Sequence, residues 1–161
     1  MRAAFGPALR RLCVALAGMA LASSASAEEI GRIGVDWVGN DIVVEAIPDP
    51  KVDGVVCHLT YFDRSLYDRV TQGNWFEDPS NSAIECVRTG PLTIGNIDRG
   101  RDGERVFRER QSLILKAVRV TRIWDADNEV LVYVAHASEL SQGSAKMAIS
   151  TVPVMPGDTW R

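Results

Sequence analysis

The feature that most constrains the fold is a period-two alternation of apolar and polar residues, which recurs along most of the chain. In residues 53–62, one parity is occupied by apolar or sulfur-bearing side chains: Val55, Cys57, Leu59 and Tyr61. Successive side chains of a strand point to opposite faces, so this pattern predicts strands with one face in a core. After the N-terminal segment, no stretch of ten or more residues shows a convincing helical period.

Turn signals made of Gly, Pro, Asn and Asp divide this pattern into short strands. We predict strands at the following residues: 30–37, 41–47, 53–62, 82–88, 104–111, 113–124, 130–137 and 147–152. Gly90-Pro91 is predicted to be a turn, and DADNE at 125–129 is predicted to be the turn of a hairpin. The fold class expected is all-β and mainly antiparallel: a single-domain sandwich or barrel of about six to eight short strands, with at most one short helix.

A leader segment opens the chain. Arg2, Arg10 and Arg11 flank the start of a short apolar run at 12–22, and Ala25-Ser26-Ala27 has the form of a cleavage signal. This layout is typical of a secretory signal peptide, with an uncleaved anchor as the alternative. We expect removal of residues 1–27 and a periplasmic β domain at 28–161. The run is shorter than the about 20 residues that a membrane-spanning helix needs, so the processed chain is not expected to span a membrane.

Removal of the leader changes the charge balance. It takes three arginines and no acid, and so leaves fifteen Lys and Arg against twenty-one Asp and Glu. Nucleic-acid affinity comes largely from clustered Lys and Arg, which makes this acidic chain a poor candidate for that role. We therefore expect no nucleic-acid partner.

The same cleavage removes Cys13 and leaves two cysteines, Cys57 and Cys86. Two cysteines in an oxidising compartment favour one disulfide. A catalytic pair of Cys57 with His58 is disfavoured because strand alternation sends these neighbours to opposite faces. A zinc site needs about four ligands, whereas the chain has two histidines and no C-x-x-C.

Residues 105–122 are strongly basic. They hold one acid, Glu109, and six cations: Arg105, Arg108, Arg110, Lys116, Arg119 and Arg122. One interpretation is an anion-binding groove across adjacent strands, suited to phosphate, an acidic polysaccharide or an anionic head group. The other, which we favour, is cross-strand pairing with the acidic strands and a solvated face.

Residues 63–81 break the alternation and are predicted to form a loop. Two of its aromatic residues, Trp75 and Phe76, suit either a contact with a partner or ligand, or a cover over an edge of the core. Glu77 and Asp78 follow them, but neighbours on a loop do not define the separation that acid–base catalysis needs.

The remaining motifs give no cofactor, metal or catalytic site. A calcium loop beginning at Asp125 needs Gly at its sixth position and Glu at its twelfth, where this chain has Val130 and His136. There is no signature of a P-loop, a dinucleotide fold, a nucleophile elbow or a zinc protease. Catalytic residues scattered through the chain stay possible, but the sequence names none.

The mature chain resembles the CreA family of small secreted bacterial proteins. The resemblance rests on five segments: EEIGRIG, NDIVVEAIPDPKVDGVVC, SAIECVRTGP, VFRERQSLILKAVRVTRIWDADNEVLVYVAHAS and GSAKMAISTVPV. They span nearly all of the mature chain and include both cysteines. Residues 62–79 and the terminal PGDTWR depart from the family pattern. The resemblance implies a periplasmic protein without an assigned activity, so no catalytic residue is carried over.

These observations together favour an exported periplasmic binding or accessory module on a disulfide-stabilised β-scaffold. Its partner would be an envelope protein or a small anionic ligand. Two alternatives stay open: an envelope enzyme of hydrolase type with scattered catalytic carboxylates, and a regulatory partner of a membrane sensor. A module without catalysis is the favoured expectation.

Overall fold

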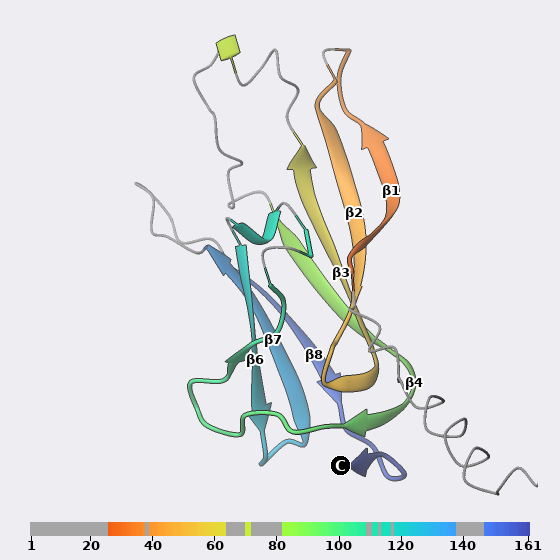
Figure 1. Ribbon diagram of the computed structural model, residues 1–161, viewed down its shortest axis with the longest axis vertical. Coiled ribbons are helices and arrows are strands. Elements are labelled where there is room, and N and C mark those ends of the chain that lie inside the picture. Colours follow the sequence, from red (N-terminus) through yellow and green to blue (C-terminus); the bar gives the residue numbers. More distant parts are fainter. Residues whose placement is uncertain are drawn as a thin grey trace, which may run out of the picture.

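The computed structural model describes residues 26–37, 39–63, 70–71, 82–108, 111–112, 114–116, 118–137 and 147–161. Across these residues the chain forms two sheets that are antiparallel except at one short pairing (Figure 1). The expected all-β class is confirmed. None of the helices among these residues is long and apolar enough to cross a membrane.

Sheet A has the strand order β1-β2-β3-β4-β9. Its strands are β1 (Glu28–Gly34), β2 (Asp41–Pro48), β3 (Val52–Asp63), β4 (Ala83–Ile94) and β9 (Thr159–Trp160). Neighbours from β1 to β4 are antiparallel, whereas β9 lies parallel to the end of β4. In Figure 1, β1 and β2 project beyond the other sheet at the top of the view.

Sheet B has the order β5-β6-β7-β8 and is antiparallel throughout. Its strands are β5 (Glu104–Arg105), β6 (Val118–Asp125), β7 (Val130–Ala137) and β8 (Met147–Pro153), and a short 3-10 helix, η3 (Ile114–Lys116), precedes β6. The β6–β7 hairpin turns at the predicted residues, with the Asp125 carboxylate accepting from the amides of Asp127 and Asn128.

One core cluster draws side chains from both sheets. The alternation that predicted β3 holds in the structure, where its inward residues are at most 7% exposed: Val55, Cys57, Leu59 and Tyr61. Strand β7 is central in its sheet, as its apolar character predicted, with Leu131, Tyr133 and Ala135 facing the core. The inner faces of the two sheets therefore share one apolar interior.

The predicted turn at Gly90-Pro91 is wrong, because β4 continues through it to Ile94. Val55 pairs with Arg88 and Asp53 pairs with Thr93, so Gly54 alone faces four residues of β4. Gly54 has φ 90°, and a Cβ there would lie 2.6 Å from the carbonyl oxygen of Pro91. This wide bulge tolerates a proline because the regular ladder is interrupted there.

Three further boundaries differ from prediction. The strand expected at 104–111 pairs only at Glu104–Arg105, because Val106 and Phe107 turn into the core at 6% and 0% exposure. The strand expected from residue 113 begins at Val118, since η3 precedes it. Strand β1 lies earlier than predicted and leaves Trp37 95% exposed beyond its end. Strand β9 was not predicted at all.

Candidate functional site

The turn between β2 and β3 holds a buried carboxylate, Asp49. Pro48 ends β2, and the side chain of Asp49 folds back over the turn. Its Oδ1 accepts hydrogen bonds from the main-chain amides of Lys51 (2.8 Å) and Val52 (3.1 Å). The Asp49 amide in turn donates to the carbonyl of Val55 at 3.1 Å. These local bonds fix the direction in which Oδ2 points, which is into the space between the sheets.

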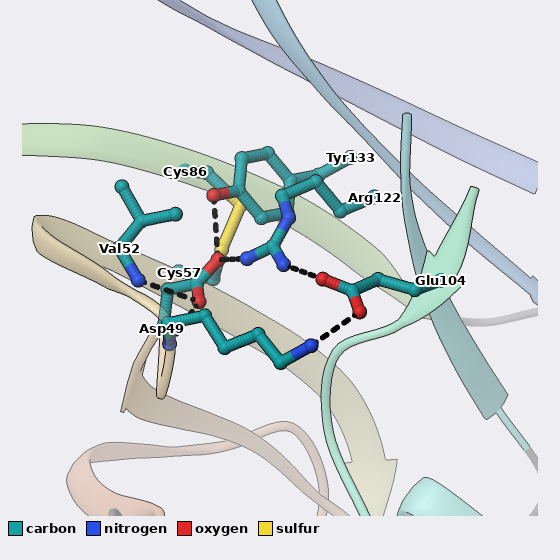
Figure 2. Close-up of polar contacts among 8 residues, drawn as sticks. Asp49, Val52, Cys57, Cys86, Glu104, Arg122 and Tyr133 are labelled. Carbon is teal, nitrogen blue, oxygen red and sulfur yellow. Dashed lines mark hydrogen bonds and ion pairs between the residues drawn. A yellow bond between two sulfur atoms is a disulfide. The ribbon is translucent and has the colours of Figure 1, made fainter. Parts of the chain in front are cut away.

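Two side chains of sheet B meet Oδ2 of Asp49 there. The Tyr133 hydroxyl donates to it at 2.7 Å, and the Arg122 guanidinium forms a short ion pair with it through Nη1. Figure 2 shows the guanidinium between the carboxylates of Asp49 and Glu104. The side chains of Arg122 and Asp49 are 1% and 0% exposed. Asp49 therefore joins the turn of one sheet to the inner face of the other.

Glu104 extends these contacts to the surface. Its Oε1 accepts from Nη2 of Arg122, and its Oε2 accepts from Nζ of Lys51 at 2.6 Å. Lys51 is half exposed, so the chain of contacts runs from solvent to the core. Burial alone would raise the pKa of Glu104, but the Lys51 hydrogen bond and the Arg122 charge lower it overall. Glu104 is thus held as a carboxylate.

The same environment fixes the protonation of the two donors. Burial by itself lowers the pKa of Arg122, but the charge and hydrogen bond of Asp49 outweigh it and raise that pKa. The pKa of the Tyr133 phenol is raised, first by burial and then by the neighbouring Asp49 charge. Near neutral pH Arg122 is therefore a charged guanidinium and Tyr133 a neutral phenol. Their contacts with Asp49 hold the two sheets together.

The predicted disulfide is present. Cys57 on β3 and Cys86 on β4 are bonded, and both are buried. They face each other directly in the register, with Cα atoms 3.9 Å apart. The Cys86 main chain bonds instead to Ser150 of β8, whose Oγ accepts from its amide at 2.8 Å and donates to its carbonyl at 3.3 Å. Cys86, which forms the disulfide within sheet A, is therefore also hydrogen-bonded to sheet B.

A second ion pair anchors the C-terminal segment. Both Nη atoms of Arg88 donate to the Asp158 carboxylate, at 2.7 and 2.8 Å. That carboxylate also accepts from the amides of Leu92 and Met155, each at 2.7 Å. The Leu92 amide lies in the β4 bulge. The Arg88 hydrogen bonds, with those of the two amides, hold the pKa of Asp158 well below its usual range despite the opposing effect of burial.

The structure separates the cations that the sequence grouped. Arg122 is buried and paired internally, so it does not contribute to a solvent-facing anion groove. Arg105, Arg108 and Arg119 are exposed, and Arg105 donates to the carbonyl of Leu115 at 3.2 Å. Lys116 lies in η3. Arg110, Trp75 and Phe76 fall outside the described residues, so the groove and the aromatic loop stay predictions.

Sequence reasoning missed Asp49, Tyr133 and Ser150. A signal existed for Arg122, because it shares parity with the buried Val118 and Val120 and so belongs to the inner face. An arginine in that position needs a buried acid, and a carboxylate between two prolines was a candidate. The identity of the acid was not predictable, since Asp49 lies 73 residues away in the chain.

Neither a metal site nor an uncommitted charged pocket emerges from the part of the chain that the structure describes. No group of three or more His, Cys, Asp or Glu in that part is arranged to hold a metal ion. A surface hollow of about 490 Å³ is lined by Pro50, Lys51, Asp53, Gly95, Asn96 and Arg161. Its charged side chains are already paired, Arg161 with Asp53 and Lys51 with Glu104. The hollow therefore gives no evidence of a charged ligand.

These contacts define a class: a small two-sheet β-protein with one sheet stapled by a disulfide and tied to the other by buried polar contacts. The chain belongs to the CreA family, since the family model described as CreA protein matches residues 30–157. Protein CreA of Escherichia coli K12 is 39% identical over 159 residues, which cover 94% of this chain and 98% of the relative. Protein CreA of strain O157:H7 gives the same values. No solved structure matches the chain significantly.

Proposed function

We propose that this CreA-family chain is an exported periplasmic protein that acts as a binding or accessory module, without catalysis of its own. The observation that carries the proposal is a contrast, among the described residues, between the charged and the apolar side chains. The charges of the buried network are committed to one another, whereas large apolar side chains stand exposed on the sheets. Met147 and Ile149 are 70% and 66% exposed on the same face of β8. Exposed apolar groups of this kind are typical of interaction surfaces.

Export is supported by three features that agree with one another. The leader-like residues 1–27 end at a small-x-small sequence, and β1 begins at the next residue, Glu28. Cys57 and Cys86 form a disulfide, which persists in oxidising compartments and is rare in the cytosol. The odd cysteine, Cys13, lies within the segment that cleavage would remove.

Fractionation tests the location directly. We expect the protein in the periplasmic fraction, with an N-terminus at Glu28 by Edman sequencing and no free thiol when it is denatured without reductant. Recovery in the cytoplasm with Met1 in place and titratable thiols would overturn the proposed export.

Site-specific crosslinking tests the binding role. A photoreactive residue at Ile149 is expected to give an adduct in intact cells, while the same residue at Arg101, on an exposed turn, serves as the control. Equal labelling from both positions, or none from either, would argue against a binding surface on β8.

An envelope hydrolase is the second candidate, and Glu45 is the described residue that favours it. Its Oε1 accepts from the Tyr61 hydroxyl at 2.8 Å, while its Oε2 is buried with no hydrogen-bond partner. A carboxylate oxygen without a protein partner is available to bind a water molecule or a substrate hydroxyl. Hydrolysis of chromogenic esters, phosphates or glycosides by the purified protein, abolished in Glu45→Gln, would support this candidate over the first.

A further inference from the structure

The face of sheet B that points away from the core carries several apolar side chains, among them the exposed Met147 and Ile149. The register aligns its residues in rows across the strands. The row through the middle of the sheet is Arg105, Thr121, Val134 and Ile149, and the next is Ile123, Val132 and Thr151. The row at the other side is Arg119, His136 and Met147. With a fourth row of Asp125, Val130 and Pro153, the rows span roughly 20 Å along the strands, and neighbouring strands lie about 4.8 Å apart.

Charge is distributed unevenly on this face. The three rows contain no acidic residue and two arginines, Arg105 and Arg119, which lie on the neighbouring strands β5 and β6. The fourth row adds Asp125 at the far corner, where its carboxylate caps the hairpin turn. Arg119 is exposed on β6, and no ion pair is found for it among the described residues. The face therefore combines a hydrophobic middle with a cationic side.

The other sheet has the opposite balance. Strands β1 to β4 carry seven acidic residues: Glu28, Glu29, Asp41, Glu45, Asp53, Asp63 and Glu85. Only Arg32 and Arg88 oppose them, and both are paired with acids of sheet A or the C-terminal segment. The molecule is thus polarised, with sheet A acidic and the outer face of sheet B basic. A negatively charged surface would attract one side of the protein and repel the other.

We propose that the outer face of sheet B docks on a bilayer containing anionic phospholipid. Arg119 would bind lipid phosphate, for which a guanidinium is well suited, and Met147 and Ile149 would enter the boundary between head groups and acyl chains. This inference rests on the proposed binding role and specifies its ligand. It does not depend on the location of the protein, because anionic lipid is the only chemistry it requires.

A protein partner fits this face less well. Protein interfaces carry about one hydrogen bond per 100–200 Å². In the middle rows the described side chains able to take part are Arg105, already bonded to a main-chain carbonyl, and the hydroxyls of Thr121 and Thr151. A bilayer surface makes no such demand on the apolar rows and supplies phosphates for the cationic side.

Vesicle sedimentation with the purified protein tests the proposal. The probes are vesicles of phosphatidylcholine alone and of phosphatidylcholine mixed with phosphatidylglycerol. We expect binding to the mixed vesicles, weakened by salt, and little binding to phosphatidylcholine alone. Arg119→Gln should lower the partition coefficient about fivefold, the loss equivalent to one basic residue at an anionic surface. Ile149→Ser should lower it by a similar factor or more.

Matched control variants distinguish binding through this face from nonspecific adsorption to vesicles. Ile33→Ser removes an isoleucine of sheet A that is 58% exposed, against 66% for Ile149, and Arg101→Gln removes an exposed arginine from a turn. Both variants should bind as the wild type does. Near-UV circular dichroism establishes that each variant is folded. Equal binding to both vesicles, no binding, or equal losses in test and control variants would overturn the proposal.

Two other occupants give distinct outcomes. A dimer in solution that Ile149→Ser dissociates, without vesicle binding, would assign the face to a second copy of the chain. An adduct from Ile149 to an acidic envelope protein, again without vesicle binding, would assign it to a protein partner. Either result overturns the lipid proposal and leaves the proposed binding role standing, whereas recovery of the protein in the cytoplasm would remove the export proposal alone.

Discussion

The hydroxyl of Ser150 bonds to both main-chain polar groups of Cys86, accepting from its amide at 2.8 Å and donating to its carbonyl at 3.3 Å. The Ser150 side chain of β8 thus supplies the hydrogen-bond partner of Cys86 at an edge of β4 that lacks a regular ladder partner there. Both residues are buried, Ser150 at 6% and Cys86 at 2% exposure. Water therefore cannot readily replace the hydroxyl.

Replacement of Ser150 by alanine should lower the free energy of unfolding by about 1–3 kcal/mol, because a buried amide and carbonyl lose their partner. Urea titration followed by fluorescence measures the change. Thr151→Ala, at the exposed neighbouring position, is the control and should stay within about 0.5 kcal/mol of the wild type. Equal effects of the two substitutions would show that the Ser150 bonds contribute little.

Arg122→Met should be strongly destabilising. It leaves the buried Asp49 carboxylate without its cation, and loss of one partner of a buried pair costs about 3–5 kcal/mol. Arg119→Met, at an exposed site on the same strand, provides the control and should have little effect. If the two variants unfold at the same denaturant concentration, the ion pair is not a principal link between the sheets.

The double variant Cys57→Ala with Cys86→Ala should lose about 3–4 kcal/mol of stability, from the greater chain entropy of its unfolded state. The estimate follows from the 29-residue separation of the two cysteines. Wild-type protein unfolded with reductant should approach the variant, while unfolding without reductant should not. Coincident curves under both conditions would mean that the bond does not constrain the unfolded chain.

Stability should fall in acid through Asp158. The pKa of this carboxyl is lowered in the folded state, mainly by Arg88, relative to an ordinary value of 3.8. Its contribution to stability is therefore complete above about pH 4 and is lost as the pH falls further toward the folded-state value. Unfolding free energies at pH 7 and pH 3 measure the loss. Asp158→Asn and Arg88→Gln should each reduce the difference, and an unchanged difference in both would exclude this pair as its source.

The local alternation of apolar and polar residues predicted those strands in which that alternation determines which side chains are buried. Strands β2, β3, β7 and β8 appeared within a few residues of their predicted positions, since alternation and flanking prolines are local signals. The course of β4 through Pro91 was not local, because it depends on the bulge opposite Gly54 and on Asp158, 66 residues beyond Leu92. Val106 and Phe107 misled the prediction, since their side chains enter the core although β5 ends at Arg105 and the Val106 amide bonds to the carbonyl of Val120 beyond that end.

The site was less predictable than the fold for the same reason. The cysteine pair followed from counting the residues left after the leader. The cluster around Asp49 joins residues that lie 73 and 84 positions away, Arg122 and Tyr133, and no sequence spacing links them. Charge composition grouped Arg122 with the exposed arginines, although its parity on β6 assigned it to the interior.

The two sheets are fastened at three strands of sheet B: β8 through Ser150, β6 through Arg122, and β7 between them through Tyr133. Neither sheet can swing open about one fastening without breaking the others. The molecule should consequently have no partly open state of low free energy. Amide protons in β3 and β7 should exchange with solvent only through global unfolding, and hydrogen-exchange measurements should give both strands the same opening free energy.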